Sequence, residues 1–117
     1  MDSILTSVKK VLGITEEYEH FDQDIIIHIN STLATLTQLG VGPEKGFAIE
    51  DSSASWSDFT TDAIQQQLAK SYIYLKVRML FDPPQNSAVI ESMNKQIAEF
   101  EWRLNVRAEG LTEDNKK

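Results

Sequence analysis

The chain has 117 residues, a formal net charge of −7 and no cysteine. This length is typical of a single domain, and the lack of cysteine excludes disulfides, thiol nucleophiles and thiolate metal sites. The acidic balance argues against a protein that grips nucleic-acid phosphates, because such binding depends on lysine and arginine. The longest purely apolar run, residues 25–27, is far too short to cross a membrane, so we expect a soluble, intracellular protein.

The charge is unevenly distributed along the chain. Residues 11–62 hold ten acidic groups and one basic group, whereas the rest of the chain sums to +2. The simplest interpretation is a solvated acidic face. The same asymmetry is compatible with head-to-tail self-association, in which unlike surfaces of identical subunits meet.

Two helices are predicted in the first 40 residues. Apolar side chains at three- and four-residue spacing predict a short helix over 2–12, ended by Gly13. A longer helix is predicted to begin at Asp22, whose carboxylate is expected to cap the first turn. It is expected to end just before Gly40, which suits the left-handed position after a helix.

A long irregular segment is predicted at 41–60, where glycine, proline and serine disfavour a helix. Residues 47–49 are expected to form at most a brief strand. A loop of this length in a compact domain is usually functional or disordered. We therefore expect its apical part, 44–55, to be free to reach a neighbour, with these candidate contacts: Glu44, Lys45, Phe47, Glu50 and Asp51.

The third helix is predicted to begin near Thr60 and to end at Phe81–Asp82, because a proline pushes the preceding residue out of the helical region. It is apolar on both sides, which is typical of a helix at the centre of a domain, or of one whose second side meets another subunit. One stripe is Ile64, Leu68, Tyr72, Leu75 and Met79, and the opposite side carries Ile73, Val77 and Leu80. A stiff structural corner follows, made by Asp82, Pro83 and Pro84.

The fourth helix is predicted from Ser87, a good N-cap, to about Ala108, with Gly110 as its stop. Trp102 lies on the back of its apolar stripe, where a helix normally faces water. The stripe has alternating spacings of three and four residues, as in knobs-into-holes packing, and consists of Ile90, Met93, Ile97, Phe100 and Leu104.

Together these elements predict an all-α fold. We expect a small four-helix domain over residues 1–110, with a long irregular loop between the second and third helices. Residues 111–117 are expected to form a polar, flexible tail.

No group of residues has the spacing of a catalytic or metal site. His20, Asp22 and Asp24 form a thin cluster, but a metal needs several converging ligands and nothing elsewhere completes the set. The serines of 51–55 have no histidine near in sequence, and the glycines of 40–46 lack the spacing of a phosphate loop. We expect no enzyme activity, no cofactor and no metal. A helix-turn-helix DNA reader is disfavoured because the Pro-Pro corner is too stiff for its turn.

The most specific pattern in the sequence is Leu80-x-Asp82-Pro83-Pro84 with Trp102-Arg103-Leu104 downstream. Before it stand, in order, the segments DIIIHINSTLATLTQLGVGP and WSDF. This succession covers nearly the whole chain. It resembles the small head–tail connector (adaptor) proteins of long-tailed bacteriophages and prophages.

The resemblance implies a virion subunit that assembles in the host cytoplasm into a homo-oligomeric ring, about twelve-fold to match the portal protein above it. Such a ring extends the DNA channel, lets DNA pass without sequence-specific binding, and receives the next connector, stopper or tail protein. No membrane is involved. The alternative is a soluble helical protein–protein interaction module, or a phage-encoded regulator, that forms no ring. The candidate subunit or portal interface consists of Ile73, Val77, Leu80, Trp102 and Arg103.

Overall fold

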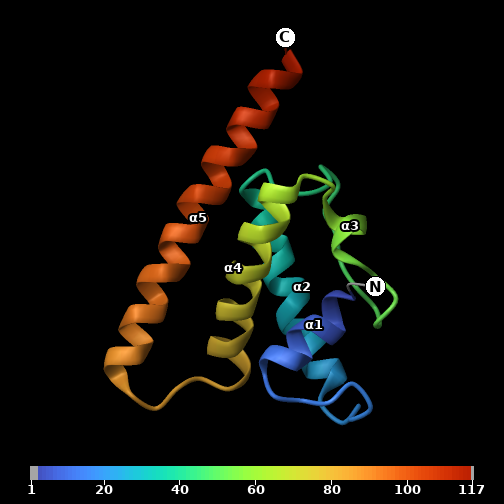
Figure 1. Ribbon diagram of the computed structural model, residues 1–117, viewed down its shortest axis with the longest axis vertical. Helices are drawn as coiled ribbons and strands as arrows, with labels where there is room; N and C mark the ends of the chain where they lie inside the picture. Colours follow the sequence, from blue (N-terminus) through green and yellow to red (C-terminus); the bar gives the residue numbers. More distant parts are fainter. Residues whose placement is uncertain (1–2, 117) are drawn as a thin grey trace.

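Five helices make up the described part of the chain (Figure 1). The computed structural model describes the backbone of residues 3–116 and the side chains of residues 3–111. Within these residues the only strand-like pairing is an isolated antiparallel bridge between Ser3 and Ser55, so the all-α prediction is confirmed. The helices are α1 (Ile4–Val11), α2 (Asp22–Gln38), α3 (Trp56–Phe59), α4 (Ala63–Phe81) and α5 (Ser87–Lys116).

The central helix is α4. It packs against α2 and against α5, while α1 contacts both α2 and α4. Ile73 and Val77 are completely buried, so packing within the single chain explains why α4 is apolar on both sides. We therefore correct the interface expected at these two residues, because their side chains belong to the core and not to the surface. Of the predicted second side, Leu80 remains at the surface, 49% exposed.

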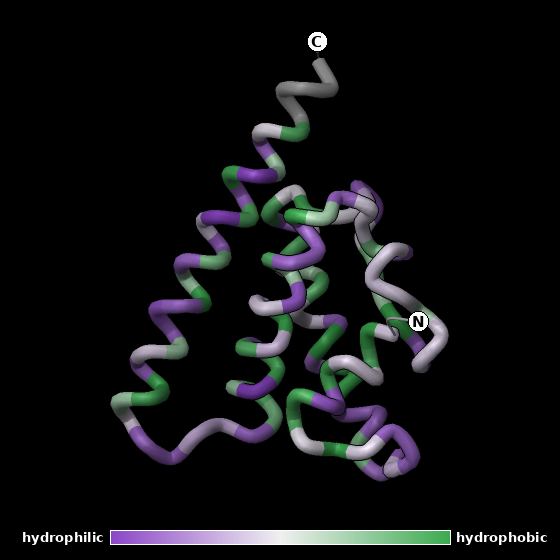
Figure 2. Tube along the Cα trace, viewed as in Figure 1, coloured by the Kyte–Doolittle hydropathy of each residue, from purple (hydrophilic) through white to green (hydrophobic). Residues whose placement is uncertain are grey.

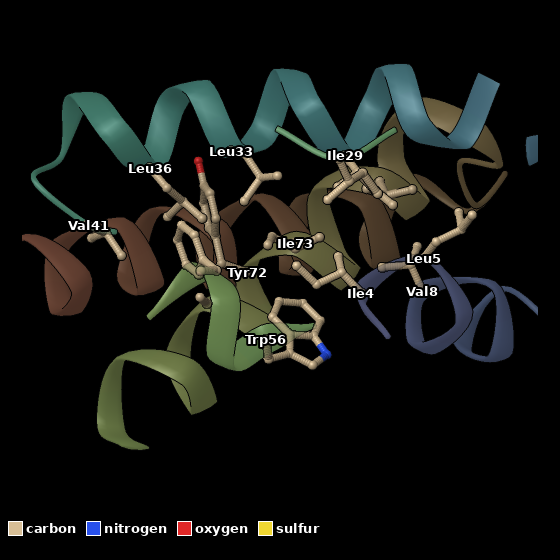
Figure 3. Close-up of a cluster of buried hydrophobic side chains, with 14 of the residues drawn as sticks. Ile4, Leu5, Val8, Ile29, Leu33, Leu36, Val41, Trp56, Tyr72 and Ile73 are labelled. Atoms are coloured by element: carbon tan, nitrogen blue, oxygen red, sulfur yellow. The ribbon is translucent and has the colours of Figure 1, made fainter. Parts of the chain in front are cut away.

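The hydrophobic core lies between α1, α2 and α4. Figure 3 shows Leu33 and Leu36 of α2 pointing toward Tyr72 and Ile73 of α4, with Trp56 below them. All five side chains are buried. Burying a large apolar side chain contributes roughly 1.5–3 kcal/mol, so these contacts fix α4 in place and leave α5 as an outer helix.

The start of α2 differs from the prediction. Asp22 is the first helical residue, Phe21 holds the N-cap position, and no side chain caps the helix. The Asp22 carboxylate instead lies 2.8 Å from the ammonium of Lys9, which is only 2% exposed. The same ammonium donates to the carbonyl oxygens of Glu16 (3.0 Å) and Tyr18 (2.7 Å). Lys9 therefore joins the acidic loop to α1 and α2 through two hydrogen bonds and one ion pair.

The irregular segment after α2 is held at its middle and is not free. The side chain of Asn30 donates from Nδ2 to the carbonyl of Ile49 (2.9 Å) and accepts the Ile49 N–H at Oδ1 (2.8 Å). Ile49 is 3% exposed. The brief strand predicted at 47–49 is absent because an α2 side chain satisfies these backbone groups. Two exposed turns remain, at 44–45 and 50–53.

A short helix that was not predicted lies before the third predicted helix, within the segment expected to be irregular. Residues 56–59 form the short helix α3, stabilised by a capping box in which Ser55 and Asp58 bond each other's backbone N–H groups. The chain is then extended at Thr60, and α4 begins only at Ala63, with the Asp62 carboxylate accepting from the backbone N–H of Gln65 at 2.9 Å. The predicted start near Thr60 is therefore wrong, because Asp62 is the cap.

The last helix is longer than predicted. It continues to Lys116, so Gly110 lies inside the helix and does not stop it. At the other end, the side chain of Asn86 accepts from the backbone N–H of Ala88 at 2.8 Å, and Asn86 takes the capping role expected of Ser87. Figure 2 shows apolar and polar positions alternating along α5. The predicted tail, 111–117, lies mostly outside the residues whose side chains the structure describes.

Candidate functional site

The outer face of α5 carries two exposed apolar side chains one turn apart. Trp102 is 68% exposed and Val106 is 47% exposed, whereas Leu104 between them is completely buried. Positions two residues apart differ by about 200° around a helix, so Trp102 and Val106 point away from α4. Exposed tryptophan is a frequent anchor of protein interfaces. The sequence singled out Trp102 but missed Val106, although its spacing of four residues from Trp102 was a usable signal.

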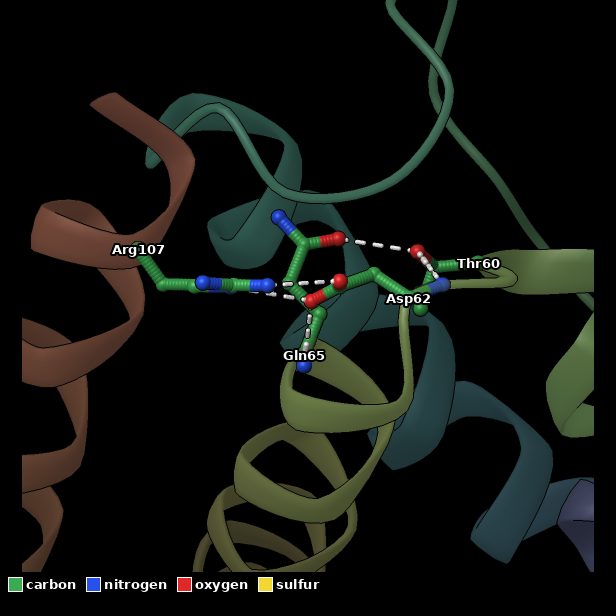
Figure 4. A network of polar contacts seen from close by, with 4 residues as sticks. All are labelled: Thr60, Asp62, Gln65 and Arg107. Atoms are coloured by element: carbon green, nitrogen blue, oxygen red, sulfur yellow. Dashed lines mark hydrogen bonds and ion pairs between the residues drawn. The ribbon is translucent and has the colours of Figure 1, made fainter. Parts of the chain in front are cut away.

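Two polar contacts fix α5 on α4 with this face outward. The Tyr72 hydroxyl donates to the Glu101 carboxylate at 2.7 Å, and burial, followed by the bond to Glu101, raises the pKa of Tyr72 above its usual range. Arg107 binds both carboxylate oxygens of Asp62, at 2.8 and 3.1 Å (Figure 4). The bond from Arg107 lowers the pKa of Asp62, as does the backbone N–H of Gln65. These contacts limit rotation of α5 about its own axis.

Charged pairs beside Trp102 are exposed and weak. Arg103 lies 3.6 Å from Glu99, and Lys95 lies 3.9 Å from Glu91. Pairs of this kind, four residues apart on an exposed helix face, contribute about 0.3–0.5 kcal/mol. Arg103 is therefore only loosely held by Glu99.

The Asp82-Pro83-Pro84 corner ends α4, as predicted. The Arg78 side chain donates to the Asp82 carbonyl at 2.7 Å, and α4 and α5 diverge toward this corner (Figure 1). Leu80 before the corner and Val89 after it are 49% and 44% exposed. The divergent end of the hairpin thus leaves apolar side chains uncovered in the single chain.

The five loop residues predicted as contacts differ in how far their side chains are exposed. Phe47 is half-buried and its ring packs against Phe59, with ring centroids 5.6 Å apart. In the turn at 50–53, Asp51 accepts from the side chain and the backbone N–H of Ser53, and these two bonds lower the pKa of Asp51. The remaining four are exposed: Glu44, Lys45, Glu50 and Asp51.

The thin cluster of His20, Asp22 and Asp24 does not form a metal site in the part of the chain that the structure describes. No group of three or more histidine, aspartate or glutamate side chains there is placed to hold a metal ion. Of the thin cluster in the sequence, Asp22 pairs with Lys9, and His20 packs edge-on against Phe21 at 4.9 Å between centroids. Among the described residues, no helix combines the length and apolar character of a membrane span.

Comparison with known proteins places the chain in a family. No curated protein and no solved structure matches it. The family model described as "Phage connector protein" matches residues 4–111. This range includes α1 to α4, the Pro-Pro corner and the outer face of α5. Because the match covers nearly the whole chain, the chain belongs to the phage connector protein family.

Proposed function

We propose that this protein is a non-catalytic head–tail connector subunit that forms a ring beneath the portal protein of a phage capsid. The ring extends the DNA channel and links the capsid to the next connector, stopper or tail protein. Family membership supports this role. The observation that carries the ring is the 68% exposure of Trp102 on a helix that two polar contacts hold in one orientation.

Two separate apolar surfaces on one chain favour head-to-tail contacts. One is the α5 outer face with Trp102 and Val106, and the other is the divergent hairpin end with Leu80 and Val89. In a closed ring each subunit contacts its two neighbours through different surfaces. A tryptophan side chain offers roughly 150–250 Å² for burial at such a contact. Arg103, beside Trp102, supplies a charged group at the edge of this contact.

The acidic surface turns suit a channel through which DNA slides. Glu50 and Asp51 are exposed on the turn at 50–53, whereas the turn at 44–45 exposes Glu44 beside one cation, Lys45. Carboxylates repel phosphates, and tight DNA binding requires cationic side chains. With these turns toward the channel or the next ring, DNA passes without being held.

The first test is replacement of Trp102 by alanine. We expect Trp102→Ala to keep the helix content of the wild type and to weaken ring formation by at least about 30-fold, as at an interface hot spot. Sedimentation velocity over a range of concentrations measures assembly, and electron microscopy with portal-bearing capsids measures docking. The matched control is Ile27→Ala, since Ile27 is 60% exposed on α2 and lies outside the proposed contacts.

Two results would overturn parts of the proposal. Unchanged ring formation by Trp102→Ala removes the α5 outer face from the interface. A wild-type protein that forms no ring, alone or on portal-bearing capsids, instead supports the alternative of an interaction module without a ring.

A further inference from the structure

A cavity of about 770 Å³ lies at the end of the domain where α5 passes the start of α4. Its walls come from the end of α2 and the turn after it, from α3, from the first turn of α4, and from Ala108 and Leu111 of α5. This volume lies within the range of roughly 300–1,000 Å³ found for small-ligand sites. None of the residues predicted as the subunit or portal interface lines it, whereas Glu44, one of the predicted loop contacts, does.

The cavity has a buried floor and an exposed rim. Phe59 and Ala108 on the floor are 2% and 6% exposed. The lining residues Glu44, Ser57 and Asp58 are exposed. The space therefore opens to the surface and can be entered by part of another molecule.

A buried amide on the floor lacks a partner on one side. Gln65 is 5% exposed, and its Oε1 accepts from the Thr60 hydroxyl at 2.8 Å. Its Nε2 forms no hydrogen bond with a described residue, and Figure 4 shows this nitrogen directed away from Thr60. This nitrogen is not a fully buried unpaired atom, so it is open to the cavity that Gln65 lines. A guest that brings an oxygen acceptor would complete this group.

The charged side chains that line the cavity determine whether a cationic or an anionic ligand is favoured. Among residues 3–111, whose side chains the structure describes, the charged side chains that line the cavity are Glu44 and Asp58, and both are acidic. One oxygen of Asp58 accepts from the backbone N–H of Ser55 at 2.9 Å, which leaves the second available. Arg107, on the turn next to Ala108, is bound to Asp62 and does not line the cavity. An anionic guest is therefore disfavoured and a cation is favoured.

We propose that this cavity binds a lysine- or arginine-bearing segment of a partner polypeptide. The cationic side chain lies against the rim carboxylates of Glu44 and Asp58, and a backbone carbonyl accepts from Gln65 Nε2. A peptide supplies both groups on one chain, whereas a simple polyamine supplies cations without the carbonyl. The proposal concerns the isolated subunit and does not depend on ring formation.

The test uses ¹⁵N-labelled full-length protein and three blocked tripeptides: acetyl-Gly-Lys-Gly-amide, acetyl-Gly-norleucine-Gly-amide and acetyl-Gly-Glu-Gly-amide. We expect the lysine peptide to shift the side-chain NH₂ resonance of Gln65 and the backbone resonances of Ser57 and Thr61, with saturation in the millimolar range, up to about 20 mM. The norleucine peptide should bind more weakly, and the glutamate peptide should leave these resonances unshifted. Spermidine should perturb the rim without shifting the Gln65 NH₂.

Two charge-neutralised variants sharpen the test. Glu44→Gln should weaken lysine-peptide binding about threefold, the effect of removing one exposed charge partner. Glu50→Gln, the matched control on the other turn, should leave the affinity unchanged, because Glu50 does not line the cavity. Equal effects of the two variants, equal binding of the glutamate peptide, or no shift at the lining residues would each overturn the proposal.

Discussion

The buried lysine between α1 and α2 gives the sharpest stability prediction. Lys9→Met keeps the length and apolar stem of the side chain but removes its ammonium. The change leaves the carbonyl oxygens of Glu16 and Tyr18 without their donor, which lies 3.0 and 2.7 Å away in the wild type. It also leaves the Asp22 carboxylate without the cation that lies 2.8 Å from it. The loop over residues 14–21 should then no longer be held against α1, and the stability of the whole domain should decrease.

The size of the effect follows from the burial of each group. Leaving a buried polar group unsatisfied costs about 1–3 kcal/mol, and breaking a fully buried ion pair costs about 3–5 kcal/mol. The side chain of Asp22 is 21% exposed, so water can recover part of its loss. We expect Lys9→Met to lower the free energy of unfolding by about 3 kcal/mol, which corresponds to a decrease of about 10 °C in Tm for a domain of this size.

The matched control is Lys10→Met. Lys10 is the exposed neighbour of Lys9 on the same helix, and surface substitutions of this kind usually change stability by no more than about 0.5 kcal/mol. Urea unfolding followed by circular dichroism measures both variants, and amide hydrogen exchange reports on residues 14–21. If the two variants lose equal stability, or if exchange in the loop is unchanged, the reasoning about Lys9 is refuted.

Two further predictions concern the other end of the domain. Gly42→Ala should lower the free energy of unfolding by about 2–5 kcal/mol, because Gly42 has a φ of +84° and a Cβ there would collide with the buried ring of Phe59. The control is Gly13→Ala, which should lower it by only about 1–2 kcal/mol, since Gly13 has a φ of +79° but open space around it. Equal losses of stability in urea unfolding would contradict this prediction. Asp62→Asn should cost about 1 kcal/mol at pH 7, because the charged pair with Arg107 is lost while the helix cap is retained. The pKa of Asp62 is lower in the folded protein, so its contribution is present above the unfolded pKa of about 3.9 and is lost as the pH falls through the folded value. The stability difference between wild type and variant should therefore begin to shrink once the pH falls below the unfolded pKa of about 3.9, and a difference that is constant from pH 7 to pH 2.5 would disprove this role.

Local patterns predicted much of the helical framework. The three- and four-residue spacing located α1 and α2, and Gly40 takes the left-handed conformation expected after α2, with a φ of +85°. The predicted inner stripe of α5 is buried where α4 covers it, at Ile97 and Leu104. These features depend on neighbours within one or two turns, so the sequence contains them directly.

The features that were missed depend on residues far apart in the chain. Whether Ile73 faces a core or another subunit is decided by the way α4 packs between α2 and α5, which periodicity alone leaves open. The position of Asn30 gives no sign that its side chain pairs with Ile49. Gly110 is unfavourable within a helix by about 1 kcal/mol, yet that cost is small enough for α5 to continue through it.

The side-chain clasp between Asn30 and Ile49 makes the segment after α2 mechanically dependent on that helix. A strand at this position would be held by several backbone hydrogen bonds to a neighbouring strand, whereas here the side-chain amide of Asn30 makes both hydrogen bonds. A displacement of α2 would therefore move the two turns on either side of Ile49 together with it. Because Leu33 and Leu36 of the same helix are buried in the core, the packing of the core also fixes the position of these turns.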